Sequence, residues 1–225
     1  MANVARLIDV ATPADPAGVV LVLHGGGSRR RSTRVSPAQP SVLRMIPVGT
    51  RIARVSAGRL AVLRLLNAQR GWDIEHTPVI DVEWALGEIA RRFGHELPVC
   101  LVGHSLGGRA ALLSAGRPQV RGVVTLAPWV APTDAVEGAH GTPIVIIHGD
   151  ADRVASPERS RRLAQTLNRD TSVSYVTVSG GTHAMLRRVD AFDGLAARCV
   201  MWILLGQVEG QQVERISAGE RWLEL

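Results

Sequence analysis

Lysine is absent from this chain, so all 26 of its Lys-plus-Arg positions are arginine, and the formal net charge is +6. A nucleic-acid-binding domain normally gathers its basic residues on one face, whereas these arginines are spread along the chain. We therefore expect no nucleic-acid partner. The one dense group, between Arg29 and Arg34, is interpreted as a solvated loop in preference to an anion site.

Cysteine is scarce as well, since Cys100 and Cys199 are the only two. Each lies in an apolar stretch, where a buried thiol is more common than a disulfide. No metal-binding spacing is present, so we predict neither a metal site nor a cofactor. Long apolar runs and the features of a signal peptide are missing too. The sequence thus predicts a cytoplasmic protein without a membrane span, and nothing in it indicates the oligomeric state.

What is present is a regular alternation of short apolar runs with helical periodicities. Strands are expected at 5–10, 18–23, 60–66, 97–102, 122–126, 143–148 and 173–178. Helices are expected at 41–57, 78–93 (with Thr77 as N-cap and Pro78 at the first helical position), 105–115, 156–167 and 184–205. Such an order predicts an α/β fold with a mostly parallel sheet and helices on both faces. We expect one domain over residues 1–205 and a loosely ordered C-terminal extension over 206–225.

The pattern G-x-S-x-G occurs at Gly103 to Gly107, between a predicted strand and a predicted helix. Glycine at both ends of the pattern leaves room for strand and helix to approach, while Ser105 projects its hydroxyl outward. The backbone N–H of Leu106, at the positive end of the helix, is suited to stabilise an oxyanion near Ser105. A glycine-rich turn without a catalytic role is the alternative interpretation.

His24 ends a predicted strand and is followed by three glycines. Their small size lets the backbone approach a substrate and aim N–H groups at a developing negative charge. Gly25 and Gly26 are therefore candidate oxyanion donors together with Leu106. Taken alone, the same run would also fit an ordinary flexible turn.

A serine hydroxyl needs a base to become nucleophilic, and a histidine oriented by a carboxylate supplies one. Asp150 and Asp152 follow the strand that ends near His148, and we favour Asp152 as the orienting acid. His183 follows the next strand, in a loop before the last long helix, and is the candidate base. The resulting order Ser, Asp, His is the one expected of α/β-hydrolases.

The combination HGGG, GHSLGG, HGDADRV and GGTHAM, in this order and at strand ends, resembles the α/β-hydrolase family over residues 19–205. Within that family the chain is similar to compact esterases of the dienelactone-hydrolase-like type, although those often carry cysteine where this chain has Ser105. The resemblance implies the following site: Ser105 as nucleophile, His183 as base, Asp152 as acid, and oxyanion donors from Gly25, Gly26 and Leu106.

Only a short loop fits between residues 126 and 143, where relatives commonly carry a large cap, so an open site with little or no cap is expected. Trp129 and His104 are candidates for contacting the substrate, a small-molecule ester. The sequence thus favours a serine hydrolase that cleaves carboxylic esters or thioesters through an acyl-enzyme. Two alternatives stay open: an acyltransferase with the same triad, and an inactive hydrolase-like scaffold that binds partners through its basic surface.

Overall fold

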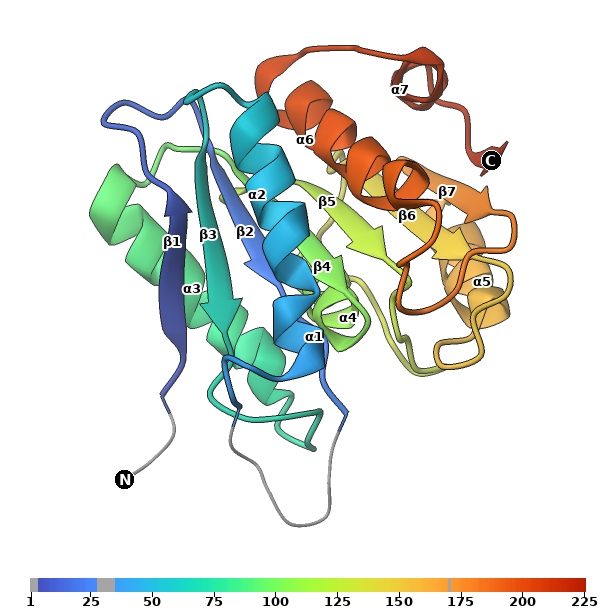
Figure 1. Cartoon of the computed structure of the whole chain (residues 1–225), viewed down its shortest axis with the longest axis horizontal. Helices are drawn as coiled ribbons and strands as arrows, with labels where there is room; N and C mark the ends of the chain where they lie inside the picture. The colour runs from blue at the N-terminus through green and yellow to red at the C-terminus, as the bar shows by residue number, and fades with distance from the viewer. Residues whose placement is uncertain (1–3, 28–34, 170) are drawn as a thin grey trace.

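The computed structural model describes residues 4–27, 35–169 and 171–225 (Figure 1). The arginine-rich segment predicted as a solvated loop, Arg29 to Arg34, lies outside the described residues. The strands are β1 (Arg6–Ala11), β2 (Val19–Leu23), β3 (Ala61–Leu66), β4 (Val99–His104), β5 (Val120–Leu126), β6 (Ile144–Gly149), β7 (Val173–Val178) and β8 (Trp222–Glu224). The helices are α1 (Pro40–Leu43), α2 (Met45–Val55), α3 (Thr77–Phe93), α4 (Leu106–Leu113), α5 (Pro157–Leu167), the π-helix η1 (Asp190–Gly194), α6 (Leu195–Leu205) and α7 (Gln211–Ser217).

All eight strands form one open sheet in the order β1-β3-β2-β4-β5-β6-β7-β8. Only β1 runs antiparallel to its neighbour, and every other pair is parallel. The predicted α/β fold is confirmed. Because parallel strands share one direction, their carboxyl ends meet at one edge of the sheet, which is where ligands bind in such folds.

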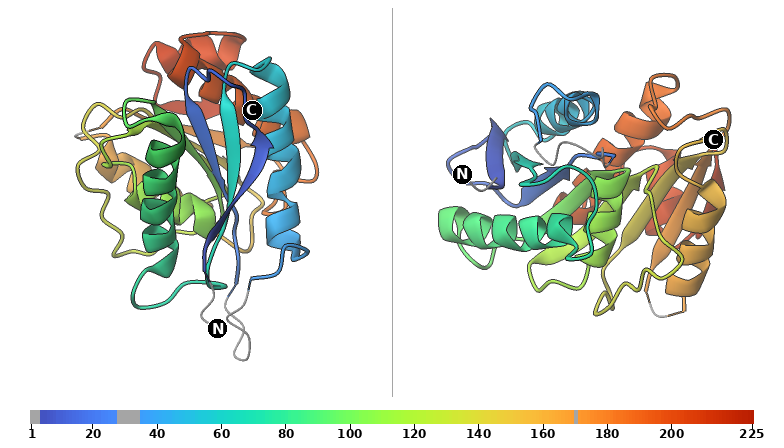
Figure 2. Two further views of the ribbon diagram at one scale, coloured as in Figure 1. Left: turned by 90° about the vertical axis from the view of Figure 1, so that its left-hand side faces the viewer. Right: turned by 90° about the horizontal axis from the view of Figure 1, so that it is seen from below.

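The sheet separates two apolar layers (Figure 2). Along the fully buried β2, Val19, Leu21 and Leu23 pack against one layer, with α3, α4 and α5, while Val20 and Val22 face the other, with α2 and α6. Strands buried on both faces read as continuous apolar runs, since no side chain of the strand meets water. That is why runs of this kind marked the central strands in the sequence.

The connection between β5 and β6, every residue of which the structure describes, contains no helix or strand between 127 and 143. No cap domain is therefore inserted at this point, as expected. In the described part of the chain, no helix is long and apolar enough to cross a membrane.

The helix expected over 184–205 is wrong at its start. The chain is irregular after His183, passes through η1, and becomes α-helical only at Leu195. Met185 and Arg188 have φ values of 56° and 61°, and a right-handed helix cannot continue through left-handed residues. Apolar periodicity alone did not reveal these two turns.

Two further expectations needed correction. The helix predicted over 41–57 divides at Arg44 into α1 and α2, with Pro47 inside the first turn of α2, where its missing N–H costs nothing. Thr77, a plausible N-cap, is instead the first residue of α3. Its backbone N–H and hydroxyl both donate to the carboxylate of Asp73, the N–H at 2.8 Å and the hydroxyl at 2.5 Å.

The segment after Gln207 forms α7 and β8, and β8 adds to the sheet beside β7. Val213 and Ile216 of α7 are buried against the same layer as α6, and Leu223 of β8 is only 1% exposed. The local pattern did not predict this strand, because β8 is three residues long and only its central side chain is buried.

We expect Leu223→Ala to lower the free energy of unfolding by about 2–5 kcal/mol, because it removes a large side chain from a packed site. Chemical denaturation followed by circular dichroism measures this. Glu224→Ala, which alters an exposed neighbour in the same strand, should change stability by less than ~0.5 kcal/mol. Equal effects of the two variants would contradict the packing of β8 against the core.

Candidate active site

Ser105 occupies the sharp turn between β4 and α4, with φ 55° and ψ −120°. Such a conformation is strained for a residue with a Cβ and persists only where surrounding packing enforces it. The two glycines of the motif supply that packing. A Cβ on Gly103 would lie 2.3 Å from the carbonyl oxygen of Gly107, and one on Gly107 would lie 2.5 Å from that of Leu23. Larger residues at either position would force strand and helix apart.

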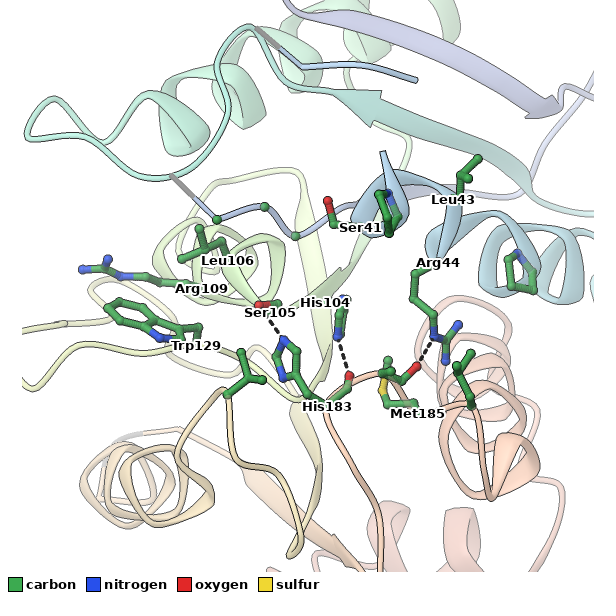
Figure 3. Close-up of a pocket in the computed structure, with 18 of the residues that line it drawn as sticks. Ser41, Leu43, Arg44, His104, Ser105, Leu106, Arg109, Trp129, His183 and Met185 are labelled. Atoms are coloured by element: carbon green, nitrogen blue, oxygen red, sulfur yellow. Dashed lines mark hydrogen bonds between the residues drawn. The ribbon is translucent and has the colours of Figure 1, made fainter. Parts of the chain in front are cut away.

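The structure brings His183 against Ser105 (Figure 3), and it places Asp152 on the far side of the His183 ring. His183 Nε2 lies 3.0 Å from Ser105 Oγ, and its Nδ1 lies 2.7 Å from Asp152 Oδ2. His183 comes from the loop after β7 and Asp152 from the loop after β6, so both belong to the carboxyl edge of the sheet. Asp150, the other carboxylate considered, instead accepts a hydrogen bond from the backbone N–H of Gly180.

The Asp152 side chain is fully buried. Burial alone would raise the pKa of its carboxyl, but hydrogen bonds from His148 and His183 and from the backbone N–H groups of Val154 and Ala155 outweigh burial and hold that pKa well below its usual range. The carboxylate is therefore charged at neutral pH. A charged acceptor 2.7 Å from Nδ1 keeps the proton of neutral His183 on Nδ1 and leaves Nε2 free to accept the Ser105 proton.

The turn after β2 lies directly against Ser105, since a Cβ on Gly25 would be 2.9 Å from that of Ser105. His24 fixes the turn. The backbone N–H of Asn67 donates to His24 Nε2, so the ring proton is on Nδ1, which donates to the carbonyl oxygen of Gly25 at 2.6 Å. In a trans peptide the following N–H points the opposite way, so the N–H of Gly26 is directed away from His24.

Leu106 is the first residue of α4, and the first N–H groups of a helix have no partner within it. Of the residues predicted as oxyanion donors, Leu106 directly follows Ser105, Gly25 lies against Ser105, and Gly26 is the next residue of that turn. All three residues line the same pocket.

Two side chains hold the loop that carries His183. His104 Nε2 donates to the carbonyl oxygen of His183 at 3.0 Å, and Arg44 Nε donates to that of Ala184 at 2.8 Å. Arg44 also forms a buried bidentate pair with Asp193. Burial lowers the pKa of His104 to about 3, with a further contribution from nearby His183, so His104 stays neutral.

A pocket of about 1200 Å³ opens over Ser105. In Figure 3, its side chains extend to both sides of the Ser105–His183 pair. One arm contains Leu106, Arg109 and Trp129, and the other contains Ser41, Leu43, Arg44 and Met185. Both predicted substrate-contacting residues, Trp129 and His104, are among those that line the pocket.

Arg109, one helical turn after Ser105, lines the side of the pocket that contains Leu106 and Trp129. Its Nε and Nη2 donate to the Asp134 carboxylate at 2.6–3.0 Å, and both side chains are less than 10% exposed. Asp134 also accepts from the backbone N–H of Ala131 at 2.7 Å. The pair therefore ties the β5–β6 connection, which contains Trp129, to helix α4.

The same guanidinium contacts two tryptophans. The Arg109 Cζ lies 3.9 Å from the centre of a Trp72 ring and 5.4 Å from that of Trp129. Cation–π contacts of this kind add about 0.5–2 kcal/mol each. Through these contacts Arg109 holds together Trp72 and Trp129, which are more than 50 residues apart in the chain. The three side chains form an aromatic wall beside Ser105.

Sequence reasoning missed Arg44, Asp193, Arg109 and Asp134. The partners Arg44 and Asp193 are 149 residues apart, so no local pattern joins them. Arg109 did carry a signal, because a residue four positions after Ser105 on a helix lies on the same face.

No group of three His, Cys, Asp or Glu side chains in the described residues is arranged to hold a metal ion. Cys100 and Cys199 are free and buried. Burial raises the pKa of Cys199 to about 12, so this thiol stays protonated.

We expect Asp134→Asn to destabilise the fold by about 3 kcal/mol, because it leaves the buried Arg109 charge without its partner. Thermal and urea unfolding measure this. Glu137→Gln makes the same chemical change at an exposed position of the same connection and should alter stability by less than ~0.5 kcal/mol. Equal stabilities of the two variants would show that the buried pair does not hold this connection.

Comparison with known proteins adds to this geometry. The family model described as PETase, PET hydrolase-like, matches residues 89–205. That span includes Ser105, Asp152 and His183. A search of the curated proteins found no significant match.

Several solved structures share the fold. A putative α/β-hydrolase from Agrobacterium tumefaciens is 19% identical, with a TM-score of 0.65 over 90% of this chain and 92% of that one. A serine hydrolase without a lid from Xanthomonas campestris is 16% identical, with a TM-score of 0.65 over 88% of each chain. Est1E from Butyrivibrio proteoclasticus, solved with ferulic acid bound, is 14% identical, with a TM-score of 0.62 over 90% of this chain and 96% of that one.

Proposed function

Since this chain belongs to the PET hydrolase-like family of α/β-hydrolases, we propose that it cleaves carboxylic esters through Ser105, His183 and Asp152 and an acyl-enzyme. The family makes the chain a hydrolase of the esterase type. The observation that carries the finer proposal is the unbroken series of contacts from Ser105 Oγ to His183 Nε2, at 3.0 Å, and from His183 Nδ1 to Asp152 Oδ2, at 2.7 Å.

In the acylation step, Ser105 Oγ attacks the ester carbonyl carbon while its proton passes to His183 Nε2. The carbonyl π bond opens, and the oxygen takes the electron pair. Asp152 stabilises the imidazolium that forms. When the carbonyl reforms, the bond to the alcohol breaks, and His183 returns the proton to the departing oxygen. Water then repeats these steps on the acyl-enzyme and releases the acid.

The oxyanion is assigned to the N–H groups of Gly26 and Leu106, at the turn beside Ser105. The hydrogen bond from His24 to the Gly25 carbonyl supports this assignment, because it turns the Gly26 N–H away from His24. Burial lowers the pKa of His24, although its hydrogen bond with Gly25 acts in the opposite direction. The His24 ring is therefore neutral at physiological pH. The orientation of the Gly25–Gly26 peptide, which this ring holds, thus stays the same over that pH range.

Trp129 is assigned to the acyl side of the site, where an aromatic acid would stack against it. The support is the wall that Trp72, Arg109 and Trp129 form within the pocket. Est1E, which shares the fold, was solved with an aromatic acid bound. An aromatic acyl ester therefore suits this arm better than an aliphatic one of equal length.

The predicted small-molecule partner, cytoplasmic location and lack of a nucleic-acid partner stay predictions. Covalent labelling of Ser105 separates hydrolysis from non-catalytic binding, and the products formed with an added alcohol separate hydrolysis from acyl transfer.

We expect a fluorophosphonate probe to add once to the wild-type protein, as read by intact mass, and not to add to Ser105→Ala. Ser41→Ala removes another hydroxyl of the same pocket and should label like the wild type. A folded wild type that stays unlabelled would favour the binding scaffold. Release of free acid in the presence of an added alcohol indicates hydrolysis, whereas formation of a new ester indicates acyl transfer.

We expect Trp129→Ala to lower kcat/KM for a benzoate ester about two- to tenfold more than for a butyrate ester, since aromatic stacking adds about 0.5–1.5 kcal/mol beyond simple burial. Paired p-nitrophenyl esters of the two acids measure the ratio. Trp84→Ala, at a partly exposed tryptophan of α3, serves as the control. An unchanged ratio would exclude Trp129 from the acyl side.

A further inference from the structure

A second histidine lies against the carboxylate that contacts His183. His148, near the end of β6, has no solvent exposure. Its Nε2 lies 3.1 Å from Asp152 Oδ2, the same oxygen that is 2.7 Å from His183 Nδ1. One carboxylate oxygen thus contacts two imidazole rings, and the proposed reaction uses only one of them.

The contact with Asp152 shows where one proton of His148 lies. An ionised carboxylate can only accept hydrogen bonds, so Nε2 of His148 carries a proton. The other ring nitrogen, Nδ1, lies 2.7 Å from Ser160 Oγ. The carbonyl oxygen of Pro157 lies 2.9 Å both from Ser160 Oγ and from the Tyr175 hydroxyl, so these groups hold the ring in place on the side away from Asp152.

The reverse tautomer does not fit the site. A proton on Nδ1 alone would leave the lone pair of Nε2 3.1 Å from a charged oxygen inside the core. Two acceptors at that distance repel each other, and burial makes an unsatisfied contact costly.

The other carboxylate oxygen is held separately. Oδ1 of Asp152 accepts from the backbone N–H groups of Val154 and Ala155, at 2.8 and 3.0 Å. The orientation of the carboxylate therefore does not depend on His148 alone. What His148 adds is a second donor on Oδ2, and that donor draws negative charge away from the bond to His183.

The surroundings of His148 contain few other titratable groups. The loop after β6 contributes Asp152, β7 contributes Tyr175 and the uncharged Thr177, and α5 contributes Ser160. Arg161 of α5 acts electrostatically on Tyr175. Beyond Asp152 stands His183, which contacts His104.

We propose that His148 is a positioning residue that sets the basicity of His183 through Asp152 Oδ2. The base of an acyl-transfer reaction must accept a proton and then release it to the leaving group. An imidazolium facing an unshared carboxylate oxygen holds its proton more tightly than one whose acceptor is shared. His148 thus keeps the His183 proton transferable. This inference rests on the proposed function of the triad.

The first experiment uses the wild-type protein, with histidine labelled by ¹⁵N and the His148 signals assigned by their loss in a variant. NMR is expected to show a proton on Nε2 of His148 across neutral pH. A bare Nε2 would overturn the proposal. This measurement does not depend on the activity of any variant.

The second experiment compares two variants of similar polarity. The amide nitrogen of glutamine reaches as far as Nε2 of histidine, whereas that of asparagine reaches only as far as Nδ1. His148→Gln therefore retains a donor for Asp152, and His148→Asn removes it. We expect the acidic limb of the pH profile of kcat/KM to move to higher pH by about half a unit in His148→Asn, and to stay at the wild-type position in His148→Gln.

KM should not change in either variant, because His148 does not line the pocket. A purely structural role predicts lower melting temperatures with an unmoved pH profile, and that result would overturn the proposal. If the wild type showed neither probe labelling nor ester turnover, the proposed function itself would be refuted. The two failures are therefore distinguishable.

Discussion

The site depends on the close approach of α4 to the carboxyl ends of β2 and β4. The backbone of Gly107 lies so near the carbonyl groups of Leu23 and His24 that no side chain fits between them. This contact sets the strained conformation of Ser105 and brings the turn after β2 against it. The position of the Ser105 hydroxyl and that of the turn after β2 are therefore consequences of one packing contact, and neither can change without the other.

The sequence indicated the parts of this arrangement that are local. Continuous apolar runs indicated the central strands, because such strands are buried on both faces. Glycines at 103 and 107 indicated the close approach of α4 to the strands, because no side chain fits there. His183 was placed by its position after a strand. The start of α6 was not predicted, because Met185 and Arg188 adopt left-handed conformations in a segment that Arg44, far away in the sequence, holds through the Ala184 carbonyl. Asp152 was favoured over Asp150, but no local pattern indicated that His148 contacts the same carboxylate.

Arginine forms the long-range contacts that local patterns could not predict. Arg44 joins the α1–α2 junction to η1 and the loop of His183, and Arg109 joins α4 to the β5–β6 connection. In both pairs a planar guanidinium meets a carboxylate through two nitrogen atoms and lies almost out of contact with solvent. An ammonium group would match neither contact, since it lacks the fork geometry and the flat face that stacks on Trp72. Irregular segments around the site are thus held by directional ion pairs instead of by secondary structure.

The two outer strands of the sheet affect how the molecule behaves beside other copies of itself. An outer strand offers unpaired backbone groups that can template association with another chain. Here β8 is only three residues long, and β1 has a register shift between Asp9 and Ala11. A short edge and an irregular edge both interrupt the ladder that a second chain would extend. The sheet can therefore remain open on both sides, and its active edge accessible, without inviting aggregation through its outer strands.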